Sequence, residues 1–280
     1  MSTGHILLLG AIAGATIFLG LPIGRLQGLS ERTRVGLSAL ATGILVFLLW
    51  DVLSHAVDPL DTALHAHHWG RFAWLAALGA AGFAGGLMSL VHYSEWMKER
   101  SNRRASTLVG PGAAAIDEFA RRTWLDTLTP GKQLSLLIAI GIGVHNFGEG
   151  LAIGQAAAAS EISLAVTLII GFGLHNATEG FGICGPLAAE GTRPSWGFLG
   201  AMGLIGGGPT FLGTVLGQAW SSEAMAVVFF TIAAGSILYV VQELFAVNRR
   251  FGHPRLIAWL VLLGILLGFA TDFVVTAAGV

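Results

Sequence analysis

The chain alternates between long apolar stretches and short polar connections. Eight stretches are nearly free of charge, and each has at least the roughly 20 residues that a helix needs to cross a bilayer core of about 30 Å. The pattern therefore predicts eight membrane-spanning helices, over 5–25, 34–57, 70–93, 133–157, 161–187, 195–219, 223–247 and 255–278. No boundary divides the chain, so we expect a single transmembrane domain over 1–280 and an all-α polytopic membrane protein.

The composition supports this fold class. Hydrophobic residues make up 54% of the chain and charged residues only 11%, whereas about 25% of a soluble protein is charged. The 40 glycines fit as well, because small residues let helices approach closely in a bilayer. The net charge of −1 gives no reason to expect a nucleic-acid partner, and the lone Cys184 excludes a disulfide framework or a cysteine-based metal site.

The basic residues predict the orientation of the helices. Of the 15 Lys and Arg residues, 14 lie in or beside the connections after spans one, three, five and seven, and Arg71 is the exception. Cytoplasmic connections of membrane proteins carry an excess of Lys and Arg, so we expect these connections inside and both termini outside. The longest of them, 97–130, is then a cytoplasmic loop, in which 115–128 has a helical pattern.

Two matching polar clusters interrupt the fourth and fifth apolar stretches. Each has the pattern His-Asn-x-x-Glu, and the second follows the first at the same depth in the membrane: His145, Asn146 and Glu149; His175, Asn176 and Glu179. At about 100° per residue, each glutamate lies about 40° from the histidine and about 60° from the asparagine, so the three side chains share one helix face. Antiparallel neighbours joined by a short turn would bring the two clusters face to face at mid-membrane.

Imidazole and carboxylate groups are ligands that suit Zn²⁺ and other first-row divalent ions. Ionisable groups inside a bilayer cost free energy and usually mark a function. We therefore expect each helix to supply half of a cation site, in which the two glutamates could bridge one ion held by the histidines and another held by the asparagines. The structural alternative is a buried hydrogen-bond network that pins the helices together.

At these residues the sequence resembles the ZIP (Zrt/Irt-like) family of divalent metal transporters. The stretches HNFGEG, from His145, and HNATEG, from His175, are similar to the family's signatures on the fourth and fifth helices. The resemblance implies a 3+2+3 arrangement of eight helices, a binuclear metal centre, uptake toward the cytoplasm and a homodimer. The sequence departs from the family pattern at Gly148, where relatives have proline, at Thr178, and at Gly208, where relatives often have glutamate. The carboxylate that would complete the second metal position is therefore missing.

Other polar residues could line the pathway of the ion. Asp51 and His55 lie at the outer end of span two with i, i+4 spacing, which suits them to receive an ion, although they could equally form an ordinary polar helix end. Gln242 and Glu243, near the inner end of span seven, are similar to a polar and acidic pair of the family and are candidate exit ligands.

We therefore predict a transporter of divalent transition metals in the plasma membrane (the inner membrane of a Gram-negative bacterium), and not an enzyme. Zinc is the first expectation, with iron, manganese, cadmium, cobalt or nickel as further substrates, and no cofactor is expected. Two alternatives stay open on the sequence. They are an intramembrane zinc hydrolase, because a His/Glu zinc site can activate water, and a proton-coupled carrier of another solute.

Overall fold

The computed structural model describes residues 3–26, 28–107, 128–158, 162–191, 193–219 and 222–277. For some segments in these ranges, including 155–158 and 162–175, only the backbone is described. The helical pattern predicted in 115–128 lies outside the described residues except for Leu128, which precedes a helix without belonging to it.

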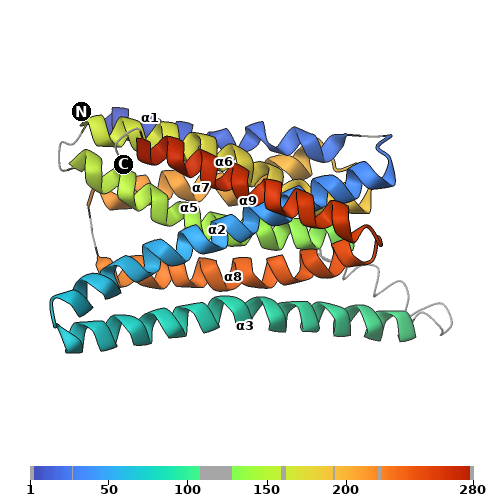
Figure 1. Cartoon of the computed structure of the whole chain (residues 1–280), viewed down its shortest axis with the longest axis horizontal. Helices are drawn as coiled ribbons and strands as arrows, with labels where there is room; N and C mark the ends of the chain where they lie inside the picture. Colours follow the sequence, from blue (N-terminus) through green and yellow to red (C-terminus); the bar gives the residue numbers. More distant parts are fainter. Residues whose placement is uncertain are drawn as a thin grey trace.

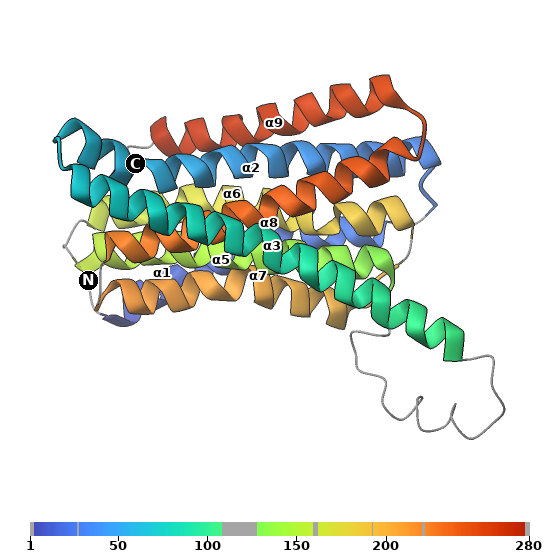
Figure 2. The same ribbon diagram turned by 90° about the horizontal axis from the view of Figure 1, so that it is seen from below.

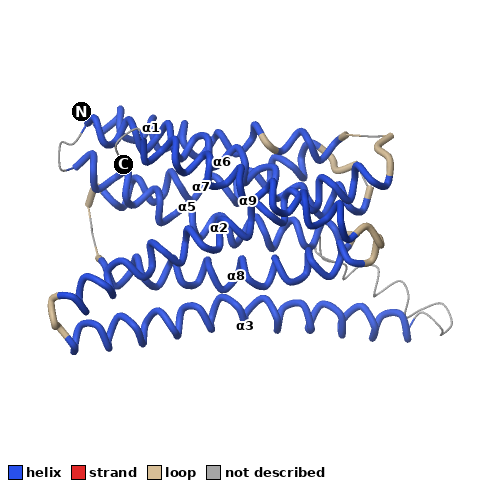
Figure 3. Tube along the Cα trace, viewed as in Figure 1, coloured by secondary structure: helices blue, strands red, loops and turns tan. Residues whose placement is uncertain are grey.

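The fold is a bundle of long helices, and the described residues contain no strand (Figure 3). The first predicted span is helix α1 (Thr3–Ala15), which continues into two 3₁₀ turns, η1 (Thr16–Leu19) and η2 (Leu21–Arg25). The other spans are the helices α2 (Glu31–His65), α3 (Trp69–Thr107), α5 (Pro130–Ala158), α6 (Ile162–Glu190), α7 (Trp196–Gly217), α8 (Glu223–Arg249) and α9 (Pro254–Ala277). The prediction of an all-α membrane protein is confirmed.

Seven of these helical segments are long and apolar enough to cross a membrane on the residues described. The remaining one, α6, is described by its backbone alone over 162–175. Both ends of the chain lie at the same end of the bundle (Figure 1), as an even number of crossings requires.

Local sequence signals begin several of the helices. The side chains of Ser30, Ser195 and Ser222 accept hydrogen bonds from the backbone amides at the starts of α2, α7 and α8, which satisfies donors that the first helical turn leaves open. The helices α5 and α9 begin with proline, whose missing N–H is not needed at that position.

The helices α2 and α3 are longer than predicted. The helix α3 continues to Thr107, through the first part of the predicted loop 97–130. At 1.5 Å per residue, their 35 and 39 residues span roughly 52 and 58 Å, which is more than a bilayer core of about 30 Å. The turn between them accordingly projects beyond the other helices (Figure 1), and the far end of α3 projects at the opposite end (Figure 2).

The helix α5 is the centre of the bundle. It packs against α6, α7 and α8, and the membrane-spanning part of α5 is mostly buried, whereas that of α9 is mostly exposed. Glycines bring α5 and α7 into backbone contact, because a Cβ atom at Gly150 would overlap the carbonyl oxygen of Thr210, and one at Gly213 would overlap that of Phe147. In chain order the described residues give α1 to α3, then α5 and α6, and then α7 to α9.

Candidate metal site

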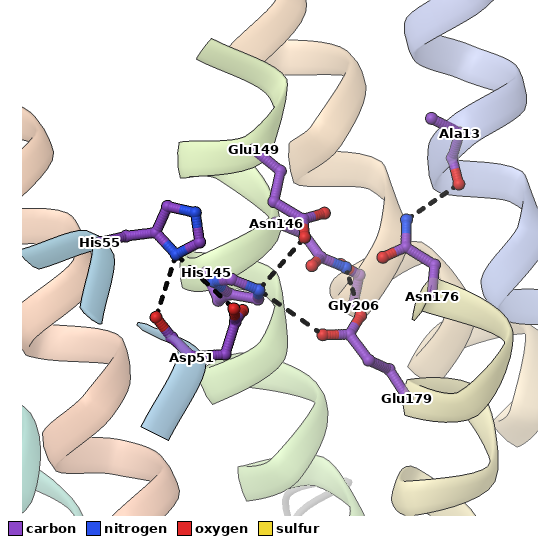
Figure 4. A network of polar contacts seen from close by, with 9 residues as sticks. All are labelled: Ala13, Asp51, His55, His145, Asn146, Glu149, Asn176, Glu179 and Gly206. Carbon is purple, nitrogen blue, oxygen red and sulfur yellow. Dashed lines mark hydrogen bonds and ion pairs between the residues drawn. The ribbon is translucent and has the colours of Figure 1, made fainter. Parts of the chain in front are cut away.

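Side chains from both predicted clusters meet in the core. The helices α5 and α6 pack against each other, and the side chains of His145, Asn146, Glu149 and Glu179 point toward a common centre between them (Figure 4). Asn146 and Glu179 are fully buried, and His145 and Glu149 are 1% and 5% exposed. A group of ionisable side chains is thus held away from both aqueous phases.

His145 contacts a carboxylate from each helix. Its Nε2 atom lies 3.3 Å from Oε1 of Glu149 on its own helix and 3.9 Å from Oε1 of Glu179 on α6. Two atoms that are each 2.0–2.1 Å from a tetrahedral zinc ion are about 3.3 Å apart. The distance from His145 to Glu149 therefore equals the separation of two zinc ligands. The distance from His145 to Glu179 would have to shorten by only about 0.6 Å to match it.

The asparagines use their amide nitrogens as structural donors. Nδ2 of Asn146 donates to Oε2 of Glu179 at 3.0 Å and to the carbonyl oxygen of Gly206 on α7 at 3.1 Å. Nδ2 of Asn176 donates to the carbonyl oxygen of Ala13 on α1 at 2.9 Å. This is the behaviour that the structural alternative expected of them. The Oδ1 atoms of both asparagines are buried without a hydrogen-bond partner among the described residues, so these oxygens are the atoms that could still bind a cation.

Thr210 is a residue of this region that the sequence reasoning missed. It lies one helical turn beyond Gly206 on α7, and its fully buried hydroxyl has no hydrogen-bond partner in the described part of the chain. A Cβ atom at Gly14 would lie 3.3 Å from the Cβ of Thr210, which places Thr210 beside the segment of α1 that holds Asn176. The signal in the sequence was a threonine directly after Gly208 and Pro209, in a helix whose other hydroxyl residue is Thr214.

Gly208 itself lies on the other face of α7. No described atom lies within 4 Å of the position of a Cβ atom there. Residues two apart on a helix point about 200° apart, so position 208 faces away from the side of α7 that carries Gly206 and Thr210.

Asp51 and His55 lie beside the core on α2. Asp51 is only 8% exposed, and Nδ1 of His55 lies 3.0 Å from its carbonyl oxygen and 3.7 Å from its Oδ1 atom. The ring of Phe230, on α8, is centred 5.6 Å from the ring of His55 and 6.2 Å from that of His145. The structure therefore brings the predicted outer pair near His145 (Figure 4), and the ring of Phe230 is close to both histidines.

Phe230 also accounts for the glycine at position 148. A Cβ atom there would lie 2.5 Å from Cε1 of the Phe230 ring, so the ring fills the space that the side chain of a proline would need. Sequence reasoning did not single out Phe230, because a phenylalanine in an apolar helix carries no signal of a special role.

The predicted inner pair is not part of the core cluster. Gln242 is exposed and Glu243 half-buried. They follow Phe230 by twelve and thirteen residues on α8, and are therefore roughly 20 Å further along the helix, toward the basic end of the bundle.

One predicted ligand lies outside the described side chains. His175 belongs to α6 by its backbone, but its side chain is not described. Among the described residues, no set of three or more His, Cys, Asp or Glu side chains already has the arrangement of a metal site.

Comparison with known families gives one match. A family model described as "ZIP Zinc transporter" matches residues 125–276. The matched region is more than half of the chain and contains α5 to α8 and nearly all of α9. No curated protein matches the chain.

Proposed function

We propose that this chain, which belongs to the ZIP zinc transporter family, carries divalent transition-metal ions, zinc foremost, through a site that α5 and α6 build together. Family membership and the helices together make it an integral, multi-pass membrane transporter of divalent metal cations. Members of the family are transporters and not enzymes. The metal, the ligands and the direction of transport are the finer parts of the proposal.

One observation supports the ligand assignment most directly. His145 contacts Glu149 at 3.3 Å and Glu179 at 3.9 Å in a buried core. An imidazole and two carboxylates at these separations suit a four-coordinate zinc ion. We propose His175, one turn before Glu179 on α6, as the fourth ligand.

The second position is proposed to be weaker than the first. It would be formed by Oδ1 of Asn146 and of Asn176, the hydroxyl of Thr210 and a shared carboxylate. Neutral oxygen ligands compensate less of the charge of a divalent ion, and they favour hard cations over zinc. An ion is therefore expected to pass through this position rather than to remain there.

The route across the membrane follows from the placement of the polar residues. Asp51 and His55 would receive the ion on the outer side and pass it by Phe230 to His145. Gln242 and Glu243 would receive it nearer the basic end of the bundle. Because this end is expected to face the cytoplasm, the proposed direction is uptake.

The cellular setting is part of the same proposal. A plasma-membrane location and a homodimer rest on the resemblance to the family. Substrates besides zinc include cadmium, iron, manganese, cobalt and nickel, because imidazole and carboxylate ligands accept all of these ions.

A flux assay in proteoliposomes tests the assignment. Glu149→Gln and Glu179→Gln each remove one negative charge with little change of shape. Each is expected to lower zinc flux at least about tenfold, because loss of a group that binds or orients a metal ion typically costs that much.

Glu223→Gln is the matched control. Glu223 lies at the outer end of α8, where it pairs with Arg71, and this variant should keep the wild-type flux. Undiminished zinc flux in both core variants would reject the site.

A further inference from the structure

A short turn at the basic end of the bundle connects α8 to α9. It consists of residues 250–253, and Gly252 adopts a φ of 69°, a backbone conformation that glycine adopts without strain. The turn places the start of α9 beside the start of α2, where Nε2 of His253 lies 3.9 Å from Oε1 of Glu31. Two cavities adjoin this turn and share Gly252, His253 and Pro254.

The first cavity is basic. Its volume is about 430 Å³, and its lining includes Arg32, His253 and Arg255. Arg32 lies in the first turn of α2 and Arg255 in the first turn of α9. Positive side chains are unfavourable at a helix N-terminus, whereas an anion there is favourable. Glu31 is the one acidic residue in these two first turns, so an anion would neutralise an excess of positive charge.

The second cavity is apolar. It has a volume of about 440 Å³ and lies between α8 and α9, where it is lined by Phe245, Ile257, Ala258 and Val261 together with Arg249. The neighbouring outward residues of α9 are large and exposed, with Trp259 at 70% and Leu262 at 44%. In a membrane protein these faces contact lipid, so the apolar cavity adjoins the hydrocarbon and the basic cavity adjoins the headgroups.

We propose that the two cavities together bind one anionic phospholipid. Its phosphate lies between Arg32 and Arg255, and part of an acyl chain lies against Phe245 and Val261. Basic pockets between membrane helices on the cytoplasmic side are suited to anionic headgroups. A free phosphate ion would fill the basic cavity only, whereas a phospholipid fills both.

Native mass spectrometry of the purified protein tests this proposal without any transport measurement. The probes are phosphatidylglycerol, phosphatidylcholine and inorganic phosphate. The wild-type protein should retain phosphatidylglycerol, and the double variant Arg32→Gln/Arg255→Gln should bind it about tenfold more weakly or worse, since each basic residue near a membrane surface adds to the attraction of anionic lipid. Ala258→Leu, which narrows the apolar cavity, should also weaken the binding of phosphatidylglycerol.

The matched control is Arg193→Gln/Arg250→Gln. These two arginines lie near the same end of the bundle, line neither cavity and make the same change in net charge. This variant should bind phosphatidylglycerol as the wild type does. Thermal unfolding of every variant identifies those that fail to fold, and Ala258→Leu tests the proposal without changing any charge.

Four outcomes overturn the proposal. The first is equal retention of phosphatidylcholine and phosphatidylglycerol by the wild type, and the second is equal weakening in the two arginine double variants. The third is binding of inorganic phosphate as tight as that of the lipid, together with no effect of Ala258→Leu, which would indicate a soluble anion. The fourth is a dimer that carries no phosphatidylglycerol, which would indicate that a second copy covers the groove.

Discussion

The buried polar side chains of the core divide into two groups by what their atoms contact. His145 contacts Glu149 on its own helix and Glu179 on α6. Asn146 and Asn176 donate hydrogen bonds to backbone carbonyl groups of α7 and α1, and Asn146 also donates to Glu179. The asparagines therefore link α5 to α7 and α6 to α1, and the Oδ1 atom of each is buried without a hydrogen-bond partner among the described residues.

At the scale of single residues, Thr210→Val is the informative change. It removes a buried hydroxyl without a hydrogen-bond partner among the described residues and changes the volume of the side chain very little. If the hydroxyl contributes one ligand contact, the zinc concentration for half-maximal flux should rise roughly two- to tenfold, the equivalent of one hydrogen bond. The thermal midpoint should stay unchanged or rise slightly, because no satisfied hydrogen bond is lost.

Thr214→Val is the control for this prediction. The Thr214 hydroxyl lies one turn further along α7 and donates to the carbonyl oxygen of Thr210 at 2.8 Å, so its role is structural. If Thr210→Val leaves the zinc concentration for half-maximal flux unchanged, Thr210 is not a ligand of the site.

The sequence predicted the convergence of His145, Glu149 and Glu179, while the contacts that support these residues were missed. Repeated motifs at matching depth were enough to predict that His145, Glu149 and Glu179 would converge, because helix periodicity and antiparallel packing determine which faces meet. The partners of the asparagines are backbone carbonyls of Ala13 and Gly206, and any residue type offers a carbonyl. Residue identity therefore could not reveal these contacts.

At the scale of the helices, the close packing of α5 against α7 depends on glycine residues. Gly150→Ala would place a Cβ atom against the carbonyl oxygen of Thr210, which is backbone and cannot rotate away. Overpacking of this kind costs about 1–3 kcal/mol, or more when the backbone must move. We expect a clearly lower thermal midpoint for this variant in detergent, measured by thermal unfolding.

Gly208→Ala is the matched comparison on α7, because the position of its Cβ atom is open. Alanine is a better helix former than glycine by about 1 kcal/mol, so this variant should be at least as stable as the wild type. Equal midpoints for Gly150→Ala and the wild-type protein would contradict the close contact of the two helices.

Helix ends were harder to predict than helix cores. Hydropathy detects only the part of a helix that lies in hydrocarbon, so it ended the third span at 93, whereas α3 continues to Thr107 through polar residues. The first span differs from its prediction in another way, because it changes from α-helix to 3₁₀ turns at Thr16. There the side chain of Thr16 donates to the carbonyl oxygen of Ala13 at 2.6 Å, and Pro22 lies in the next turn.

The whole molecule is arranged so that its two ends differ in charge. Both termini lie at one end (Figure 1), and the turns that carry Arg25, Arg193, Arg249 and Arg250 lie at the other. The predicted topology, with the termini outside, follows from this asymmetry. It also places the proposed lipid site in the inner leaflet, where anionic lipids are enriched.

Accessibility of single cysteines tests the orientation. The native Cys184 is buried and donates to the carbonyl oxygen of Leu21 at 3.2 Å, so it should react little. A membrane-impermeant maleimide should label His68→Cys, in the turn between α2 and α3, in intact cells. It should label Arg250→Cys, at the end of α8, only after permeabilisation. The reverse pattern would mean that the termini lie inside.

The location of zinc in the loaded protein tests most directly whether α5 and α6 each supply half of one cation site. An anomalous difference map at the zinc absorption edge, from crystals grown with zinc, should show a peak between the two helices. Nε2 of His145 and carboxylate oxygens of Glu149 and Glu179 should lie about 2.0–2.2 Å from it. A map with no zinc peak between α5 and α6, or with the bound zinc held by residues of one helix alone, would contradict the account.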